Sequence, residues 1–316
     1  MSAKLTHHLT NSLLAPGLIL CLLGSCGDLL NVDSEPVKPK ESSGARSERK
    51  LRKTTFHLVP KAGDTALPRG SRTVDERLVE MERMILKVQS GDEVTGSGNL
   101  SISYEDKRTV DVISANIRRI NLDKSSASIK MAINGQEPTV VNEDSPLQGQ
   151  VLTSDKGEVS MAGVPNNEQK RALAEYQGPW FGGNRLFPAH EVKRNDAWQC
   201  KPEQMLEAIF DSNFTQASGS VDMHVKRVLN LDGHECVEII VSLNRCKGIT
   251  KGKDGEESEM EVHAYGSIFR SLDVFHVLKA DIKGDVVVNL PGPQGLKYKG
   301  SGPFLFTATS EVELAE

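Results

Sequence analysis

Two stretches decide the fold of this chain: VDMHVK at residues 221–226 and VEIIVSL at residues 237–243. In both, apolar and polar side chains alternate, which is typical of a β-strand that buries one face. Asp232-Gly233 lies between them and is a common sequence of tight hairpin turns. The two stretches therefore predict a long antiparallel hairpin with one apolar face.

Further strands are predicted on both sides of this hairpin. Leu100 and Ile102 begin an alternating apolar run that leads to a turn at Asn134-Gly135. Towards the C-terminus the pattern predicts strands at 259–269, 272–282, 286–290 and 304–314, with a turn at Lys283-Gly284. A sheet of this size with one apolar face must curl on itself or pack on a second sheet. We therefore expect a mainly β fold, an antiparallel curved sheet, half-barrel or sandwich, with a few short helices.

Helical spacing occurs in three places. Between 74 and 88 the apolar residues recur every three or four positions, so the pattern alone favours a helix, while the neighbouring strands favour an extended segment. These residues are Val74, Leu78, Met81, Ile85 and Val88. Short helices are also expected at 168–176 and from Pro202 onwards. The apolar side of the latter consists of Met205, Leu206, Ile209 and Phe210.

Residues 1–25 have the layout of a secretory signal peptide. A short polar stretch, in which Lys4 is the charged side chain, precedes the uncharged apolar run from Leu13 to Leu23. This run is about half of the roughly 20 residues that a membrane-spanning helix needs, and Pro16-Gly17 interrupts it. We therefore interpret it as a targeting segment and not as a membrane span.

The four residues Leu23-Gly24-Ser25-Cys26 at the end of this run resemble the lipobox of bacterial lipoproteins. The resemblance implies a diacylglyceryl group on the Cys26 sulfur, acyl chains such as palmitate, and cleavage that leaves Cys26 as the first residue. Two or three acyl chains anchor a protein stably to a bilayer. The open alternative is an ordinary signal peptide in which a cysteine falls at this position by chance.

The resemblance also implies a location in the bacterial cell envelope. Gly27 after the cysteine favours the outer membrane over the inner one, and Asp28 beside it weakens this preference. Residues 26–54 are polar and rich in Pro, Ser and Gly, so we expect a disordered tether that reaches roughly 30 Å. The β-rich domain, residues 55–316, would then lie in the periplasm or at the cell surface, and it could divide into two sub-sheets near 145–200.

The order of the pieces resembles uncharacterised families of secreted β-rich bacterial lipoproteins over residues 140–314. The similarity rests on three groups of residues: Ser145-Pro146-Leu147 with Gly149, the run from Phe187-Pro188 to Asp196-Ala197-Trp198, and Gly266-Ser267-Ile268 with Asp273. These families bring no known activity with them. The resemblance therefore implies a fold and a compartment, and nothing about chemistry.

Composition and motifs restrict the function classes. Without Lys4 the chain has 37 basic and 43 acidic residues, a net charge of −6, so we expect no nucleic-acid partner. It contains no Gly-x-Ser-x-Gly nucleophile elbow and no His-x-x-x-His pair, and we expect no catalytic residues, metal or cofactor. We favour a non-enzymatic binding or structural module, with an unknown protein or an apolar ligand as partner. The alternative is an envelope hydrolase, which a cleft grouping such as His190, Asp196 and Cys200 would indicate.

Two sets of residues are candidates for lining a ligand site. Trp180, Phe181 and Trp198 flank a Gly-rich loop, where aromatic side chains either line a ligand mouth or plug the open end of a sheet. Val221, Met223 and Val225 share the apolar hairpin face with Val237 and Ile239. A curved sheet that carries an apolar ligand would present a cavity there, and a closed, fully packed core would exclude that version.

Cys200, Cys236 and Cys246 are candidates for a disulfide because the envelope permits one. Cys236 and Cys246 on one straight strand would be about 33 Å apart, whereas a bridge needs Cα atoms within roughly 7 Å. A bridge would therefore use Cys200 and leave one thiol over. Three buried free thiols are the equally open alternative.

Overall fold

The computed structural model describes residues 55–61, 67–156, 158–176, 184–251, 255–292 and 295–315. Over these residues the chain forms a 12-stranded antiparallel sheet and a small sheet of β1 (Thr55–Phe56) and β8 (Val192–Lys193). Two short helices accompany them, α1 (Asn167–Glu175) and α2 (Pro202–Phe210). The predicted antiparallel curved sheet with a few short helices is confirmed. The predicted signal peptide, lipidation site and tether lie outside the described residues.

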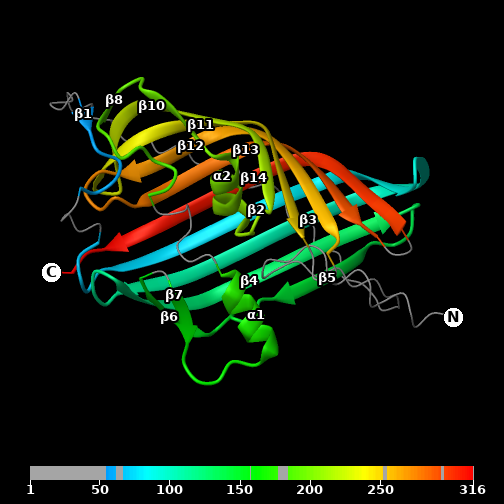
Figure 1. Ribbon diagram of the computed structural model, residues 1–316, viewed down its shortest axis with the longest axis horizontal. Coiled ribbons are helices and arrows are strands. Elements are labelled where there is room, and N and C mark those ends of the chain that lie inside the picture. Colours follow the sequence, from blue (N-terminus) through cyan, green and yellow to red (C-terminus); the bar gives the residue numbers. More distant parts are fainter. Residues whose placement is uncertain are drawn as a thin grey trace, which may run out of the picture.

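The large sheet has the order β7-β6-β4-β3-β2-β14-β13-β12-β11-β10-β9, and β5 pairs with β4. Its strands are β2 (Arg72–Ser90), β3 (Glu93–Val112), β4 (Ile117–Ile133), β5 (Thr139–Asp144), β6 (Val151–Asp155), β7 (Glu158–Met161), β9 (Ala197–Cys200), β10 (Gln216–Leu231), β11 (His234–Lys251), β12 (Glu257–Ser271), β13 (Val277–Pro291) and β14 (Leu296–Glu313). The sheet curls into a trough, and α2 lies within it (Figure 1). One face is therefore concave and apolar, and the other is convex and carries most of the charged side chains.

The hairpin at the heart of the sequence is β10 with β11. Val221 lies opposite Leu243 and Met223 lies opposite Val241, in the register that the alternation predicts. Asp232 and Gly233 both have positive φ, at 50° and 91°, as the turn between two closely paired strands requires. The predicted hairpin and its apolar face are confirmed.

Glycines allow the sheet to curl sharply at β12 and β13. A Cβ atom on Gly266 would lie 2.0 Å from the carbonyl oxygen of Asp281, and one on Gly284 would lie 2.1 Å from that of His263. Only residues without a side chain let neighbouring backbones approach so closely. The turn predicted at Lys283-Gly284 is therefore wrong, because β13 runs through these residues without a break.

The helix favoured at 74–88 is also wrong. Residues Arg72–Ser90 form β2, one of the longest strands of the sheet, with β3 on one side and β14 on the other. A bulge between Met81 and Met84, where Arg83 has a φ of 51°, places two residues three positions apart on the same face. This bulge produces part of the three- and four-residue spacing that imitates a helix.

Both short helices begin close to where the sequence predicts. Asn166 caps α1 in a reciprocal capping box with Gln169, and Pro202 occupies the first turn of α2. Ala172 of α1 packs with Val110, Ile120 and other buried residues of β3, β4 and β6 in a small second core. The first strand, β1, consists of two residues only, Thr55–Phe56.

Candidate functional site

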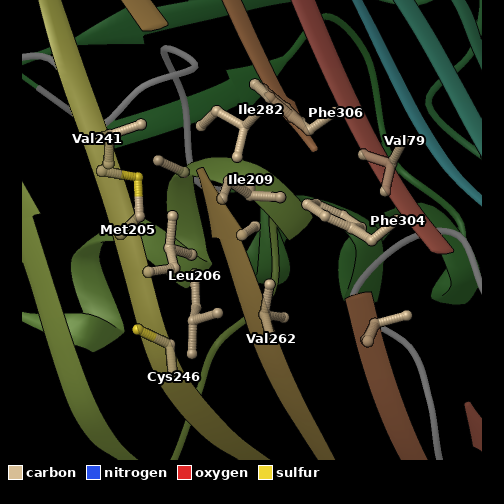
Figure 2. Packing of buried hydrophobic residues seen from close by; sticks show 14 of the residues in the cluster. Val79, Met205, Leu206, Ile209, Val241, Cys246, Val262, Ile282, Phe304 and Phe306 are labelled. Carbon is tan, nitrogen blue, oxygen red and sulfur yellow. The ribbon is translucent and has the colours of Figure 1, made fainter. Parts of the chain in front are cut away.

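The apolar concave face is filled by α2. Met205, Leu206 and Ile209 are fully buried and pack against side chains that point inward from β2 and from β11 to β14 (Figure 2). Phe210 contacts Phe304 of β14 with ring centroids 5.6 Å apart. On β11, Gly248 leaves room for the helix, because a Cβ there would lie 3.0 Å from Leu206 and 2.4 Å from Phe214. Helix and sheet therefore fit each other as parts of one core.

The predicted ligand-lining residues of the hairpin lie in this core. Val221 and Val225 are fully buried, Met223 is 1 % exposed, and Val237 and Ile239 have no exposed surface. Side chains without solvent-exposed surface are closely packed on all sides and leave no room for a ligand beside them. The cavity that a carrier would need at this position is absent among the described residues.

Of the candidate aromatic residues, Trp198 is the one that the structure describes, whereas Trp180 and Phe181 lie outside the described residues. Trp198 is half-buried on β9 and packs against the main core. Its indole Nε1 donates a hydrogen bond to the carbonyl oxygen of Leu186 at 3.0 Å. Trp198 thus connects β9 to the segment around Leu186.

Near the start of β2 and the end of β3, the inward-facing positions hold charged side chains instead of apolar ones. Asp75 lies opposite Arg108 and Arg77 lies opposite Asp106, so two Asp-x-Arg pairs face each other in reversed order. Nε of Arg108 donates to Asp75 at 3.0 Å, and Nε of Arg77 donates to Asp106 at 2.9 Å. These four residues and Asp211, whose carboxylate lies 3.5 Å from Arg77, are called the charge cluster below.

The charge cluster connects both helices to the sheet. Asp211 is the residue that follows α2, and Tyr176 is the residue that follows α1. The hydroxyl of Tyr176 accepts a hydrogen bond from Nη1 of Arg108 at 3.1 Å. Two buried arginines thus hold the C-terminal ends of two helices that belong to distant parts of the sequence.

The pKa values of Asp75 and Asp211 are shifted in opposite directions. Burial favours the neutral form of Asp75, but a hydrogen bond from His276 and the charge of Arg108 outweigh it and hold the pKa of Asp75 well below its usual range. Ser310 also donates to this carboxylate, at 2.6 Å. Burial raises the pKa of Asp211, because Arg77 is already paired with Asp106 and compensates it only in part. Asp75 is therefore a fixed anion, and Asp211 is the more easily protonated.

Pattern reasoning on single strands misses the charge cluster. It reads Asp75, Arg77, Asp106 and Arg108 as solvated polar positions, although they occupy the alternate positions that bury their side chains. One feature of the sequence could have indicated the cluster. Asp-x-Arg occurs in both strands, at alternate positions that lie on the same face as the apolar residues Val79 and Ile102. That signal becomes visible only when the two strands are known to be neighbours.

The three described cysteines are free thiols in the structure. Cys236 and Cys246 are buried on β11, and Cys246 donates to the carbonyl oxygen of Ser220 at 3.2 Å. Burial raises the pKa of Cys200 and of Cys236 to about 12 and that of Cys246 to about 11. At neutral pH these groups are thiols, so none is an activated nucleophile.

The grouping that would indicate a hydrolase does not form. His190 is exposed, Asp196 accepts a hydrogen bond from the backbone N–H of Lys193 at 3.0 Å, and Cys200 of β9 pairs with Val221 of β10. Among the described residues no hydrogen bond or ion pair connects these three side chains.

Ser271, Asp273 and His234 resemble a catalytic triad in composition but not in order. Asp273 lies between the other two: it accepts from the Ser271 hydroxyl and contacts Nδ1 of His234 at 2.8 Å. A triad needs the histidine between serine and aspartate, so that the imidazole can take the serine proton. The Ser271 oxygen also accepts from the backbone N–H of Val274 at 3.0 Å, as in a side-chain-stabilised turn. This group therefore shapes the turn between β12 and β13.

The described residues contain no group of three or more His, Cys, Asp or Glu side chains placed to hold a metal ion. Neither of the two described helices has the length and apolarity to cross a membrane.

Comparisons with known proteins return distant structural neighbours. No family model and no curated protein matches the chain. Lipovitellin, in a structure that describes its lipid–protein interactions, is 10 % identical with a TM-score of 0.37 over 79 % of this chain and 26 % of its own. The outer membrane protein OprG from Pseudomonas aeruginosa is 6 % identical with a TM-score of 0.29 over 80 % of this chain and 100 % of its own. This chain thus spans about a quarter of lipovitellin, and both TM-scores are too low to bear on function.

Proposed function

We propose that this chain is a lipid-anchored protein of the bacterial cell envelope whose curved-sheet domain is a non-enzymatic binding or structural module. The anchor rests on Leu23-Gly24-Ser25-Cys26 in the sequence. The non-enzymatic module rests on one observation: the concave face, where a curved sheet would hold a ligand or substrate, is occupied by α2. The described cysteines have raised pKa values, and Asp75 and Asp106 are engaged in ion pairs with buried arginines.

A module of this kind meets its partner on its outside. The convex face carries hydroxyl, amide and charged side chains, and several of its ion pairs are exposed, such as Lys107–Glu76 at 2.7 Å. The strands at the two ends of the sheet, β7 and β9, are only four residues long. Short end strands discourage pairing with other chains, so the broad convex face is the better binding surface.

Fractionation of cells that express Cys26→Ala tests the anchor. The variant should leave the membrane fraction and appear in the soluble envelope fraction, because it has no thiol to carry the lipid. Cys21→Ala is the matched control, since Cys21 lies inside the apolar run and should be removed with it. Intact mass should show a mature chain that starts at Cys26 with its acyl chains. A Cys26→Ala protein that stays in membranes contradicts the anchor.

Native mass spectrometry of the gently extracted protein tests the module. We expect the mature chain without a stoichiometric non-covalent lipid, because the concave face is filled, and with a protein partner where one survives extraction. A stoichiometric apolar ligand in addition to the covalent lipid would show that α2 can leave the concave face, and would favour a carrier instead.

A further inference from the structure

One buried charge in the described domain is not matched by a counter-charge. Arg270 lies at the end of β12, between Val237 of β11 and Val277 of β13, and is 2 % exposed. Its Nε donates to the carbonyl oxygen of Leu58 at 3.1 Å, and its Nη2 donates to Oδ1 of Asn184 at 2.5 Å. The guanidinium carbon lies 4.5 Å from the centre of the Phe187 ring. Segments from three distant parts of the chain therefore surround it.

All of these partners are neutral. Among the described residues no carboxylate forms an ion pair with Arg270, whereas Arg77 pairs with Asp106 and Asp211, and Arg108 pairs with Asp75. Its third nitrogen, Nη1, has no hydrogen-bond partner among the described residues. Burial without an opposing charge lowers the pKa of Arg270 to about 9. A buried cation in such surroundings is unfavourable unless an anion joins it.

One of the contacts of the guanidinium comes from an exposed residue. Asn184, which holds Nη2, is an exposed residue at the start of a turn that continues through Arg185 to Leu186. The amide oxygen of Asn184 is a neutral acceptor, and an oxyanion in its place would make a charge-assisted, two-pronged contact that is shorter and stronger. Displacement of one exposed side chain therefore gives an anion access to two N–H groups of Arg270.

We propose that Arg270, together with Asn184 and Phe187, forms an oxyanion-binding site at this end of the sheet, for a carboxylate or phosphate group. Asn184 occupies the site when it is empty and leaves when the anion binds. The ring of Phe187 holds the guanidinium plane in place for a two-pronged contact. The site lies at the end of the concave face and includes no residue of the lipid anchor or of α2, so it does not depend on the proposed function.

Titration calorimetry on the full-length protein in neutral detergent tests the site. The probes are inorganic phosphate, acetate and short-chain dihexanoyl phosphatidate, each at an ionic strength matched with sodium chloride. We expect saturable binding of at least one probe, with a weakening of about tenfold or more in Arg270→Gln. Preference for the phosphatidate over phosphate assigns the site to lipid headgroups, and the reverse assigns it to free anions. No binding of any probe overturns the proposal.

Two further variants keep the test independent of folding defects in Arg270→Gln. Asn184→Asp leaves Arg270 in place but supplies a carboxylate of the chain itself, so it should abolish anion binding and raise the thermal unfolding midpoint. Arg185→Gln removes an exposed arginine of the same turn, whose contact to Glu207 is 4.0 Å long, and should bind like the parent protein. Equal binding by Asn184→Asp and the parent would overturn the proposal.

A spectroscopic signal locates the binding event. The Trp198 indole N–H donates to the carbonyl oxygen of Leu186, so its proton resonance reports on the 184–187 turn. Phosphate or acetate should shift this resonance along the same saturation curve as the heat signal. An unchanged indole resonance at saturation would place the anion elsewhere and overturn the assignment.

Discussion

At the scale of single residues, two of the three aspartates of the charge cluster, Asp75 and Asp211, are in opposite electrostatic situations. Asp75 accepts contacts from Arg108, Ser310 and His276, whereas Asp211 shares Arg77 with a closer competitor, Asp106. A carboxylate stabilised as an anion supports the fold by its charge, and one that burial pushes towards neutrality does not. The two residues should therefore respond differently to the same substitution.

Asp75→Asn should destabilise the domain by about 3 kcal/mol at pH 7, because it leaves Arg108 buried without its carboxylate. The pKa of Asp75 is lowered in the folded state, so its contribution is complete above the unfolded pKa of about 4 and is lost as the pH falls below it. Urea unfolding of both proteins between pH 7 and pH 3 measures the difference. A gap that stays constant down to pH 3 would contradict the electrostatic explanation.

Asp211→Asn should leave the unfolding free energy unchanged within about 1 kcal/mol at pH 7, or raise it slightly. The folded pKa of Asp211 is raised, so its ionised form opposes folding above the unfolded pKa, and an amide has no such charge. Asparagine also tolerates the left-handed backbone at this position, where φ is 52°. Urea unfolding at pH 7 beside Asp75→Asn checks it, and a loss as large as that of Asp75→Asn would show that Asp211 is an essential ion-pair partner.

The sequence predicts very little of the structure at this scale. Its candidate residues were aromatic side chains, cysteines and the hairpin face, whereas the polar groups that interact inside the domain are Asp75, Arg108 and Arg270. Their partners lie between 33 and 235 residues away along the chain, for example Asp75 for Arg108 and Ser310 for Asp75. Spacing within one segment carries no information about pairs of this kind.

At the scale of elements, α2 is the part that turns an open sheet into a closed core. Its apolar residues are few, yet each is buried against strands that are distant from one another in the sheet. The helix occupies the connection between β9 and β10, two strands that pair directly. A short turn could connect these two neighbouring strands. In this chain the connection contains a helix, and this helix fills the trough.

Leu206→Ala should cost about 3 kcal/mol of unfolding free energy, the typical loss for a fully buried leucine whose surroundings cannot collapse. Val164→Ala is the control, because Val164 is 94 % exposed and should change stability by less than about 0.5 kcal/mol. Equilibrium unfolding in urea compares the two. A cost for Leu206→Ala no larger than that of the control would mean that α2 packs loosely on the sheet.

Elements with one strong periodicity are predictable, and those with mixed signals are not. The β10–β11 hairpin and α2 follow from alternation and from Pro202 with its apolar side. The strand β2 does not, because its buried face begins with Thr73, Asp75 and Arg77 and then crosses the bulge at Arg83. Charges on the inner face remove the alternation of apolar residues that identifies a strand.

At the scale of the whole molecule, the filled trough predicts that the folded domain exposes no large apolar cavity. The soluble Cys26→Ala protein should give little fluorescence with the apolar dye ANS, which reports accessible apolar surface. Ile209→Asp places a charge at a fully buried position of α2, and it should expose the concave face and raise the dye signal several-fold. Bright fluorescence from the parent at native pH would point to an accessible cavity and to a carrier.

The class of the fold was predictable and the order of its strands was not. Alternation with one apolar face requires a curved or layered sheet, as the structure has. β14 joins the two parts of the sheet, and its place between β2 and β13 depends on contacts between the two ends of the domain. Arg72 at the start of β2 pairs with Glu313 at the end of β14, and no local pattern marks these residues as neighbours.

The pairing of β14 with β2 also has a consequence for how the chain comes to be folded. Strands from β2 to β7 and from β9 to β13 can assemble as two separate arrays of neighbours, but β14 alone joins them. While the C-terminal strand is still inside a ribosome or a translocation channel, both arrays keep an unpaired edge. Contacts between such distant segments form slowly, so an emerging chain stays extended and able to thread through a channel. Truncation before Leu296 should for the same reason yield a protein that proteases remove.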